Sequence, residues 1–136
     1  MNSTRDRKKS ISLIFRGFDL TAQEVASLVE VMPSRLGNRG EPVKPGVKTR
    51  LVRSYVGFSM DFSNDYALCD MVPAFLAHLG GVDHLCQIKN QVRPEFFEID
   101  CHLPVGGTDD IQDGHFPTTV IADIFKLGAT LGLSFF

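Results

Sequence analysis

The chain has 136 residues, of which 43% are hydrophobic and 22% charged, and its formal net charge is −2 at pH 7. This length and composition are typical of one globular domain with one core. A slightly acidic chain has no general field to attract nucleic acid or an anionic membrane. Its apolar stretches are also far shorter than the roughly 20 residues of a membrane span. We therefore expect a domain that binds neither nucleic acid nor a membrane.

The first ten residues are polar and basic, and no apolar run long enough for a secretory signal follows them. We interpret residues 1–10 as a disordered basic tail and residues 11–136 as a single α+β domain. The three cysteines, Cys69, Cys86 and Cys101, are odd in number and widely spaced. This favours free thiols in a reducing cytoplasm over a disulfide scaffold.

A strand and a helix are the first predicted elements. Residues 11–18 alternate in polarity, which predicts a strand. Thr21, with Glu24 three residues later, forms the capping box that marks a helix start, and Pro33 ends the helix. The apolar residues after the cap share one helical face: Val25, Leu28, Val29 and Met32.

A segment rich in structure breakers and a second strand follow. Residues 34–49 contain many Gly, Pro, Lys and Arg residues, which predicts a loop with room for no more than a short edge strand. Residues 53–62 alternate again. One face of that strand carries Val56, Phe58, Met60 and Phe62, and the other carries Arg53, Tyr55, Gly57, Ser59 and Asp61.

Two helices are predicted in the middle of the chain. Apolar residues at helical spacing indicate a helix that Asp70 caps, with Pro73 in its first turn and Gly80 and Gly81 after its end. Asp83 is the predicted cap of the second helix. Its inward residues are Leu85, Ile88 and Val92.

The last elements are a strand, a helix and a closing strand. Residues 95–103 place Phe97, Ile99, Cys101 and Leu103 on one face and Phe96, Glu98, Asp100 and His102 on the other. A polar loop over residues 104–117 leads to a helix capped by Thr118 or Thr119 and ended by Gly132. Its apolar residues are Val120, Ile121, Ile124, Phe125, Leu127 and Leu131. Residues 133–136 are predicted to form a short strand, which we expect at a sheet edge, where pairing between subunits is favoured.

The sequence lacks the common motifs of catalysis and cofactor binding. It has no G-x-x-x-x-G-K-[ST] or G-x-G-x-x-G phosphate loop, no G-x-S-x-G elbow and no closely spaced metal ligands. Residues 109–114 resemble the start of a calcium loop, but Ile111 and Val120 stand where oxygen ligands are required. We therefore expect a solvated acidic loop there, with no cofactor, no metal and no catalytic residues in the domain.

Polar side chains gather at the outward positions of the three predicted strands. If these strands lie side by side, one surface carries Arg16, Tyr55, Ser59, Asp61, Glu98, Asp100 and His102. Planar side chains and carboxylates on a rigid sheet suit the binding of a partner or a small polar ligand. An open sheet face is polar in any case because it meets water, so a merely solvated surface is the alternative interpretation.

Four segments together resemble a known family. They are Phe-Asp-Leu-Thr-Ala-Gln-Glu-Val at 18–25, Pro-Ser-Arg at 33–35 with Arg-Gly-Glu-Pro at 39–42, Ser-Tyr at 54–55, and Leu-Gly-Ala-Thr-Leu-Gly-Leu at 127–133. Over residues 11–136 the chain resembles the mainly bacterial domain-of-unknown-function family DUF4279, although Tyr55 replaces that family's usual Trp. The resemblance implies a compact α+β domain without an established activity or cofactor, and some members are suspected of being immunity-type proteins that bind a partner toxin.

These elements predict an α+β fold with a mostly antiparallel sheet and helices mainly on one face, a ferredoxin-like sandwich with an extra C-terminal helix and strand. We expect a non-enzymatic interaction domain that binds a protein partner, or a second copy as a homodimer, through the polar sheet face and the 34–49 loop. The alternative is a small-molecule sensor or minimal enzyme in which His102 forms an acid–base pair with Glu98 or Asp100.

Overall fold

The computed structural model describes residues 8–104 and 114–136 of the chain. Most of the predicted basic tail and the acidic segment around Asp109 and Asp113 therefore lie outside the described residues. The elements follow one another as β1 (Lys9–Arg16), α1 (Ala22–Val29), β2 (Arg35–Gly37), β3 (Tyr55–Phe62), α2 (Leu68–His78), α3 (Val82–Val92), β4 (Phe96–Leu103), α4 (Thr118–Leu127) and β5 (Thr130–Phe135).

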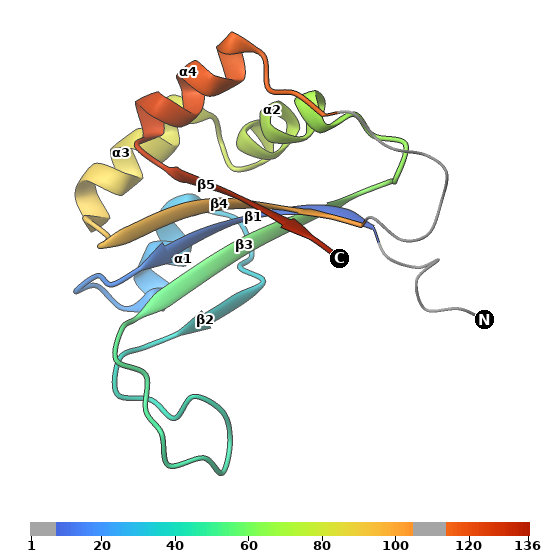
Figure 1. Cartoon of the computed structure of the whole chain (residues 1–136). Helices are drawn as coiled ribbons and strands as arrows, with labels where there is room; N and C mark the ends of the chain where they lie inside the picture. The colour runs from blue at the N-terminus through green and yellow to red at the C-terminus, as the bar shows by residue number, and fades with distance from the viewer. Residues whose placement is uncertain (1–7, 105–113) are drawn as a thin grey trace.

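The strands form one five-stranded sheet in the order β2-β3-β1-β4-β5. Its neighbours are antiparallel except β4 and β5, which are parallel. The part from β1 to β4 has the strand order and connections of a ferredoxin-like sandwich, and α4 with β5 adds one βαβ unit at the edge of β4. Figure 1 shows α2, α3 and α4 stacked over the sheet. The predicted α+β sandwich, with its extra helix and strand, is confirmed.

The core lies between the helices and one face of the sheet. On the central strand β1, Ile11, Leu13 and Phe15 are fully buried on this side. Helix α1 contributes buried residues to the same core, among them Val25 and Val29. All four helices therefore pack on one face, and the side chains at the alternate strand positions lie on the other.

The start of α1 matches the predicted capping box, but its end does not match the prediction. The Thr21 hydroxyl accepts a hydrogen bond from the Glu24 amide at 3.1 Å, and the Glu24 carboxylate accepts one from the Thr21 amide at 3.1 Å. The helix ends at Val29, because Glu30 adopts a left-handed conformation with φ of 65°. Met32, predicted on the buried face, is therefore outside the helix and 87% exposed.

The predicted caps of the other three helices are wrong. The residues that precede α2, α3 and α4 are Ala67, Gly81 and Pro117, and none of them makes a side-chain capping bond. Asp70 and Asp83 lie inside the first turns, where a carboxylate still interacts favourably with the helix dipole.

Two further helix predictions need correction in the same way. Because α2 starts at Leu68, Pro73 lies beyond its first turn, at an exposed position of the helix. Thr118 and Thr119 are the first two residues of α4 rather than its caps. In each case the helix starts earlier than its best capping residue, since tertiary packing of the apolar stripe outweighs a cap.

The C-terminal helix is shorter than predicted. It ends at Leu127, where Gly128 takes a left-handed conformation with φ of 67°, and Leu131 belongs to β5. Ile121 and Phe125, two of the apolar residues predicted at helical spacing, are 54% and 86% exposed. Apolar residues continue past Leu127 into β5. The sequence pattern therefore indicated neither where the helix ends nor which of its apolar residues are buried.

The N-terminal tail is shorter than predicted, because Lys9 and Ser10 belong to β1. The Lys9 side chain faces the helices and is only 5% exposed. Its ammonium donates a hydrogen bond to the Tyr66 carbonyl at 2.7 Å. Loss of hydration on burial lowers the pKa of Lys9, and the charge of nearby Asp65 partly opposes this.

Candidate functional site

The seven residues predicted to form one polar surface do lie on one face of the sheet, opposite the helices. The register arranges this face in rows across β3, β1 and β4: Tyr55–Arg16–Phe96, Gly57–Ile14–Glu98, Ser59–Ser12–Asp100 and Asp61–Ser10–His102. We call this surface the open face. It exists because residues with even numbers on β1 and β4 and odd numbers on β3 point away from the core.

Two arginines on and beside the open face have acidic neighbours. Arg16 lies 3.7 Å from the Glu98 carboxylate. Arg53 lies 3.2 Å from the carboxylate of Glu95, and its guanidinium stands 5.3 Å from the centre of the Phe96 ring. All of these groups are substantially exposed to solvent, so each pair adds little to stability and can exchange its partner at small cost.

Arg35 extends the open face onto the outer strand β2, and the strand patterns in the sequence did not identify it. It lies on β2 opposite Gly57, and its side chain crosses the space that a side chain at position 57 would occupy. A Cβ atom there would stand 3.2 Å from Arg35 Cγ, 3.3 Å from its Nε and 3.7 Å from Ile14 Cγ1. The stem of Arg35 therefore covers Gly57 beside Ile14, which is only 4% exposed although it lies on the open face.

The guanidinium of Arg35 is available for a partner. Within residues 8–104 and 114–136 it makes no hydrogen bond or ion pair, in contrast to Arg16 and Arg53. The neighbouring Ser34 hydroxyl is engaged instead with the sheet, since it donates to the Gly57 carbonyl at 3.0 Å and lies 3.0 Å from the Ser59 hydroxyl. Arg35 is thus a charged group on a fixed strand without a counter-ion of its own among the described residues.

Two shallow hollows adjoin Arg35. One, of about 530 Å³, lies beside His102 and is lined by Ser10, Ser12, Ser34, Arg35, Ser59, Asp61, His102 and Phe136. The other, of about 320 Å³, is lined by Arg16, Arg35, Leu51, Val52, Arg53 and Tyr55. Both are within the size range of ligand sites, but they are open to solvent. Arg35 lines both, so a single partner can reach it from either side.

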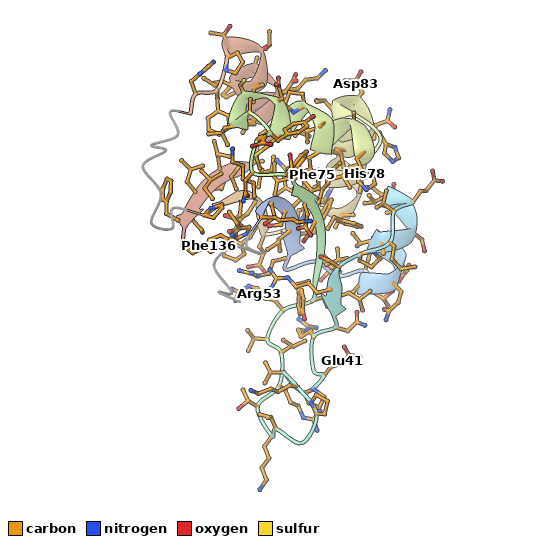
Figure 2. All side chains as sticks on the ribbon, turned by 90° about the vertical axis from the view of Figure 1, so that its right-hand side faces the viewer. Glu41, Arg53, Phe75, His78, Asp83 and Phe136 are labelled. Atoms are coloured by element: carbon orange, nitrogen blue, oxygen red, sulfur yellow. The ribbon has the colours of Figure 1, made fainter. Side chains whose placement is uncertain are left out.

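The 34–49 segment, predicted as a loop with at most a short edge strand, does contain a short edge strand, β2. After β2 the chain runs out and back over residues 38–54 as a hairpin-like arm, which projects away from the sheet (Figure 1). Backbone hydrogen bonds tie its two sides together, from Gly40 to the Leu51 carbonyl at 2.9 Å and from Val43 to the Thr49 carbonyl at 2.9 Å. Figure 2 shows the arm continuing beyond Arg53 and Glu41, clear of the helices.

The root of the arm is fastened to the domain by side chains. The Asn38 amide oxygen accepts a hydrogen bond from the Ala22 backbone at 2.7 Å, at the start of α1. The Ser54 hydroxyl accepts one from the Arg39 backbone at 2.9 Å, and Ser54 is buried. The direction of the arm is therefore set by the same residues that begin β3 and α1.

The arm concentrates positive charge. It carries Arg39, Lys44, Lys48, Arg50 and Arg53 against the single acidic residue Glu41, a charge of +4. Because the whole chain carries −2, the remaining residues carry −6. All six charged side chains are exposed. The net charge of the chain therefore conceals two regions of opposite sign.

The predicted acid–base pair of His102 with Glu98 or Asp100 is not assembled. Among the described residues no hydrogen bond joins His102 to either carboxylate. Glu98 is paired with Arg16, and the Asp100 carboxylate lies over Gly132, where a side chain would collide with it. His102 instead faces the larger hollow beside Asp61 and the serines.

The described part of the chain holds no group of three or more His, Cys, Asp or Glu residues placed to share an ion. The three cysteines are free thiols. Burial raises the pKa of the Cys101 thiol to about 11, and the charge of Asp100 adds to this. No helix among these residues has the length and apolar character needed to cross a bilayer.

Comparisons of this chain with protein-family models, with curated proteins and with solved structures found no match. A functional interpretation therefore has to come from the arrangement of the side chains on the open face and the arm.

Proposed function

We propose that this chain is a non-enzymatic binding domain that takes an acidic protein partner on its open face and arm. One observation carries the proposal: Arg35 of β2 lines two hollows, with no counter-ion among the described residues. A guanidinium in that position offers paired donors that match the geometry of a carboxylate.

Charge complementarity supports an acidic partner. The arm extends the basic region of Arg35 outward through five exposed basic side chains. Opposite charge on the partner would accelerate its encounter with this region and fix its orientation. Tyr55, which lines the smaller hollow beside Arg35, supplies the aromatic surface that is common at the centre of protein interfaces.

A protein fits the open face better than a nucleic acid. The carboxylates of Asp61, Glu98 and Asp100 lie among the arginines on this face, and they would repel a phosphate backbone. The arm has no aromatic side chain on which a base can stack. A protein surface that carries both positive and negative charges can pair with the carboxylates as well as the arginines of the open face, which a polyphosphate chain cannot do.

The resemblance to DUF4279 agrees with this proposal. Two of its four segments contribute to the open face and the root of the arm, one through Ser34, Arg35 and Arg39 and the other through Ser54. The Arg39 backbone bonds the Ser54 hydroxyl, and Arg35 lies next to Tyr55 in the smaller hollow. An immunity-type role, in which the partner is a toxin, requires a surface of this kind.

The proposal predicts that Arg35→Ala weakens the binding of an acidic peptide by about tenfold, the effect of losing charge-assisted hydrogen bonds worth 1–2 kcal/mol. A fluorescently labelled oligoglutamate peptide at low ionic strength serves as the probe, with anisotropy as the readout. Tyr55→Ala should also weaken binding. Lys126→Ala removes the same charge from the helix layer and should leave the affinity unchanged.

Two outcomes would overturn the proposal. The first is equal affinity of the peptide for the Arg35→Ala and Lys126→Ala variants, since binding would then follow overall charge alone. The second is a single-stranded oligonucleotide that binds more tightly than the peptide and depends on the same arm residues.

A second candidate function is the binding of a small polar ligand in the larger hollow. The observation that favours it is the set of polar side chains that line this hollow together, including three serines of the sheet, Arg35 and His102. A small zwitterion such as glycine is a suitable probe for a lining that contains both Arg35 and Asp61. In an NMR titration we expect it to shift the imidazole signals of His102, whereas those of His115, which is exposed and outside the hollow, should not move. Equal movement of both would exclude this candidate.

A further inference from the structure

Strand β5 is an outer strand of the sheet, and it lacks the features that usually protect such an edge. It is hydrogen-bonded to β4 on one side only, so half of its backbone groups face outward. Native proteins shield edges with short strands, charged residues or proline. The opposite edge, β2, has three residues and includes Arg35. Strand β5 has six residues, and none of them is charged or a proline.

Helix α4 adds exposed apolar side chains above this edge. Its ridge of Val120, Ile124 and Leu127 is buried, whereas Ile121 and Phe125 are 54% and 86% exposed. With 3.6 residues per turn, Ile121 and Phe125 share one flank of the helix. Lys126, on the other flank, bonds Asp83 of α3 at 2.6 Å. The apolar flank therefore faces away from α3, toward the outer edge of the sheet.

The strand itself continues this apolar surface. Leu133 and Phe135 pair in register with Cys101 and Leu103 of β4, on the helix-facing side of the sheet. They are nevertheless 46% and 62% exposed, since no other strand of the described residues lies beyond β5 in the sheet. Figure 1 shows β5 passing below α4, so the strand edge and the helix flank belong to the same side of the domain.

We propose that this side of the domain binds a second copy of the chain, through antiparallel pairing of β5 with β5 and contact of α4 with α4. A strand edge presents unpaired backbone groups that can pair with a second strand. The residues Thr130–Phe135 are uncharged, so they offer nothing for a charged partner to recognise and nothing that repels an identical strand. A two-fold axis brings the same patch of both copies together, which is the commonest arrangement in homodimers.

The available area is sufficient for a dimer of moderate stability. A phenylalanine side chain offers about 150–250 Å², so Phe125 and Phe135 together expose roughly 300 Å² in each copy. With Ile121, Leu133 and the strand backbone included, two copies bury on the order of 1,000 Å², the lower limit for a specific interface. We therefore expect a dimer that dissociates measurably across the micromolar range.

The test is the molar mass of the intact chain as a function of concentration, measured by sedimentation equilibrium. The wild type should change from monomer to dimer, and Phe125→Glu should raise the dimer dissociation constant at least tenfold, because two copies of the new carboxylate would be buried without partners. Met32→Glu is the matched control. Met32 is 87% exposed, as Phe125 is at 86%, but it lies after α1, which packs over β2 and β3, and its substitution should not change the dissociation constant.

Hydrogen exchange supplies a second measurement, which identifies the strand. Amides of residues 130–135 should become more protected as the wild-type concentration rises, and Ile121→Glu should abolish this gain while the circular dichroism stays native. A wild-type chain that remains monomeric at all concentrations would overturn the inference, as would a dimer that survives both glutamate substitutions. Arg35→Ala should leave the dimer intact, so failure here is distinguishable from failure of the acidic-partner proposal.

Discussion

Replacement of Phe15 by alanine should lower the free energy of unfolding by about 3–5 kcal/mol, the cost of removing a large ring from a core that cannot close around the gap. Phe15 is fully buried on the central strand β1. Its ring meets those of Phe58 on β3 and Phe97 on β4 edge to face, with centroids 6.4 Å and 4.9 Å away. Removal of the ring therefore eliminates the contacts by which Phe15 joins β1 to both of its neighbouring strands.

Urea unfolding followed by circular dichroism measures this loss, and Phe96→Ala is the control. Phe96 belongs to the neighbouring strand β4 but lies on the open face, where it is 42% exposed. Its removal deletes the same ring and should cost no more than about 1 kcal/mol, mainly through the lost contact with the Arg53 guanidinium. Similar losses in the two variants would mean that the helix-facing side is not the core.

The division of the sheet into two faces was predictable because alternation in a strand is a local property. Each side chain in residues 9–16, 55–62 and 96–103 points to the face opposite its neighbours, so Tyr55 and Glu98 could be placed on one surface before the pairing of their strands was known. The register between the strands determines only which of these residues are neighbours across the sheet. This is why the seven predicted residues share a face although their mutual contacts differ from the expected ones.

Arg35 could not be placed from the sequence for the opposite reason. Three residues of β2 are too few for alternation to be recognised, and they stand among glycines and prolines that indicate a loop. The strand exists because its backbone pairs with β3 at Arg35, Leu36 and Gly37. That is a long-range interaction, which no local pattern reports. The Pro-Ser-Arg segment of the family resemblance was the only sequence feature that marked the position.

The charge of the arm shows why net charge is a poor guide to partners. A net charge of −2 argues against polyanion binding only if positive and negative charges are evenly mixed over the surface. Here the arm separates +4 from the rest, and its backbone bonds between Gly40 and Leu51 and between Val43 and Thr49 hold these charges away from the acidic domain. Local electrostatics in this molecule therefore depend on a hairpin-like structure in a segment that was predicted as a loop with at most a short edge strand.

Stability should fall at alkaline pH because of Cys101. Burial against the core raises the pKa of this thiol from its ordinary value of 9.0 to about 11. In the unfolded chain the thiol loses its proton near pH 9, whereas in the folded chain it keeps the proton until about pH 11. The unfolded state therefore binds fewer protons in this interval, and the free energy of unfolding decreases as the pH rises. A difference of two pKa units corresponds to a loss of at most about 2–3 kcal/mol.

The measurement is the free energy of urea unfolding at pH 8 and at pH 11 for the wild type and for Cys101→Ala. The alanine variant should lose less stability over this interval, by about 2–3 kcal/mol. Contributions from other groups, such as the buried ammonium of Lys9, are common to both proteins and cancel in the comparison. Cys86→Ala retains Cys101 and should therefore decline as the wild type does. If wild type and Cys101→Ala decline equally, the thiol ionises as readily in the folded chain as in the unfolded one, and its burial against the core has been misjudged.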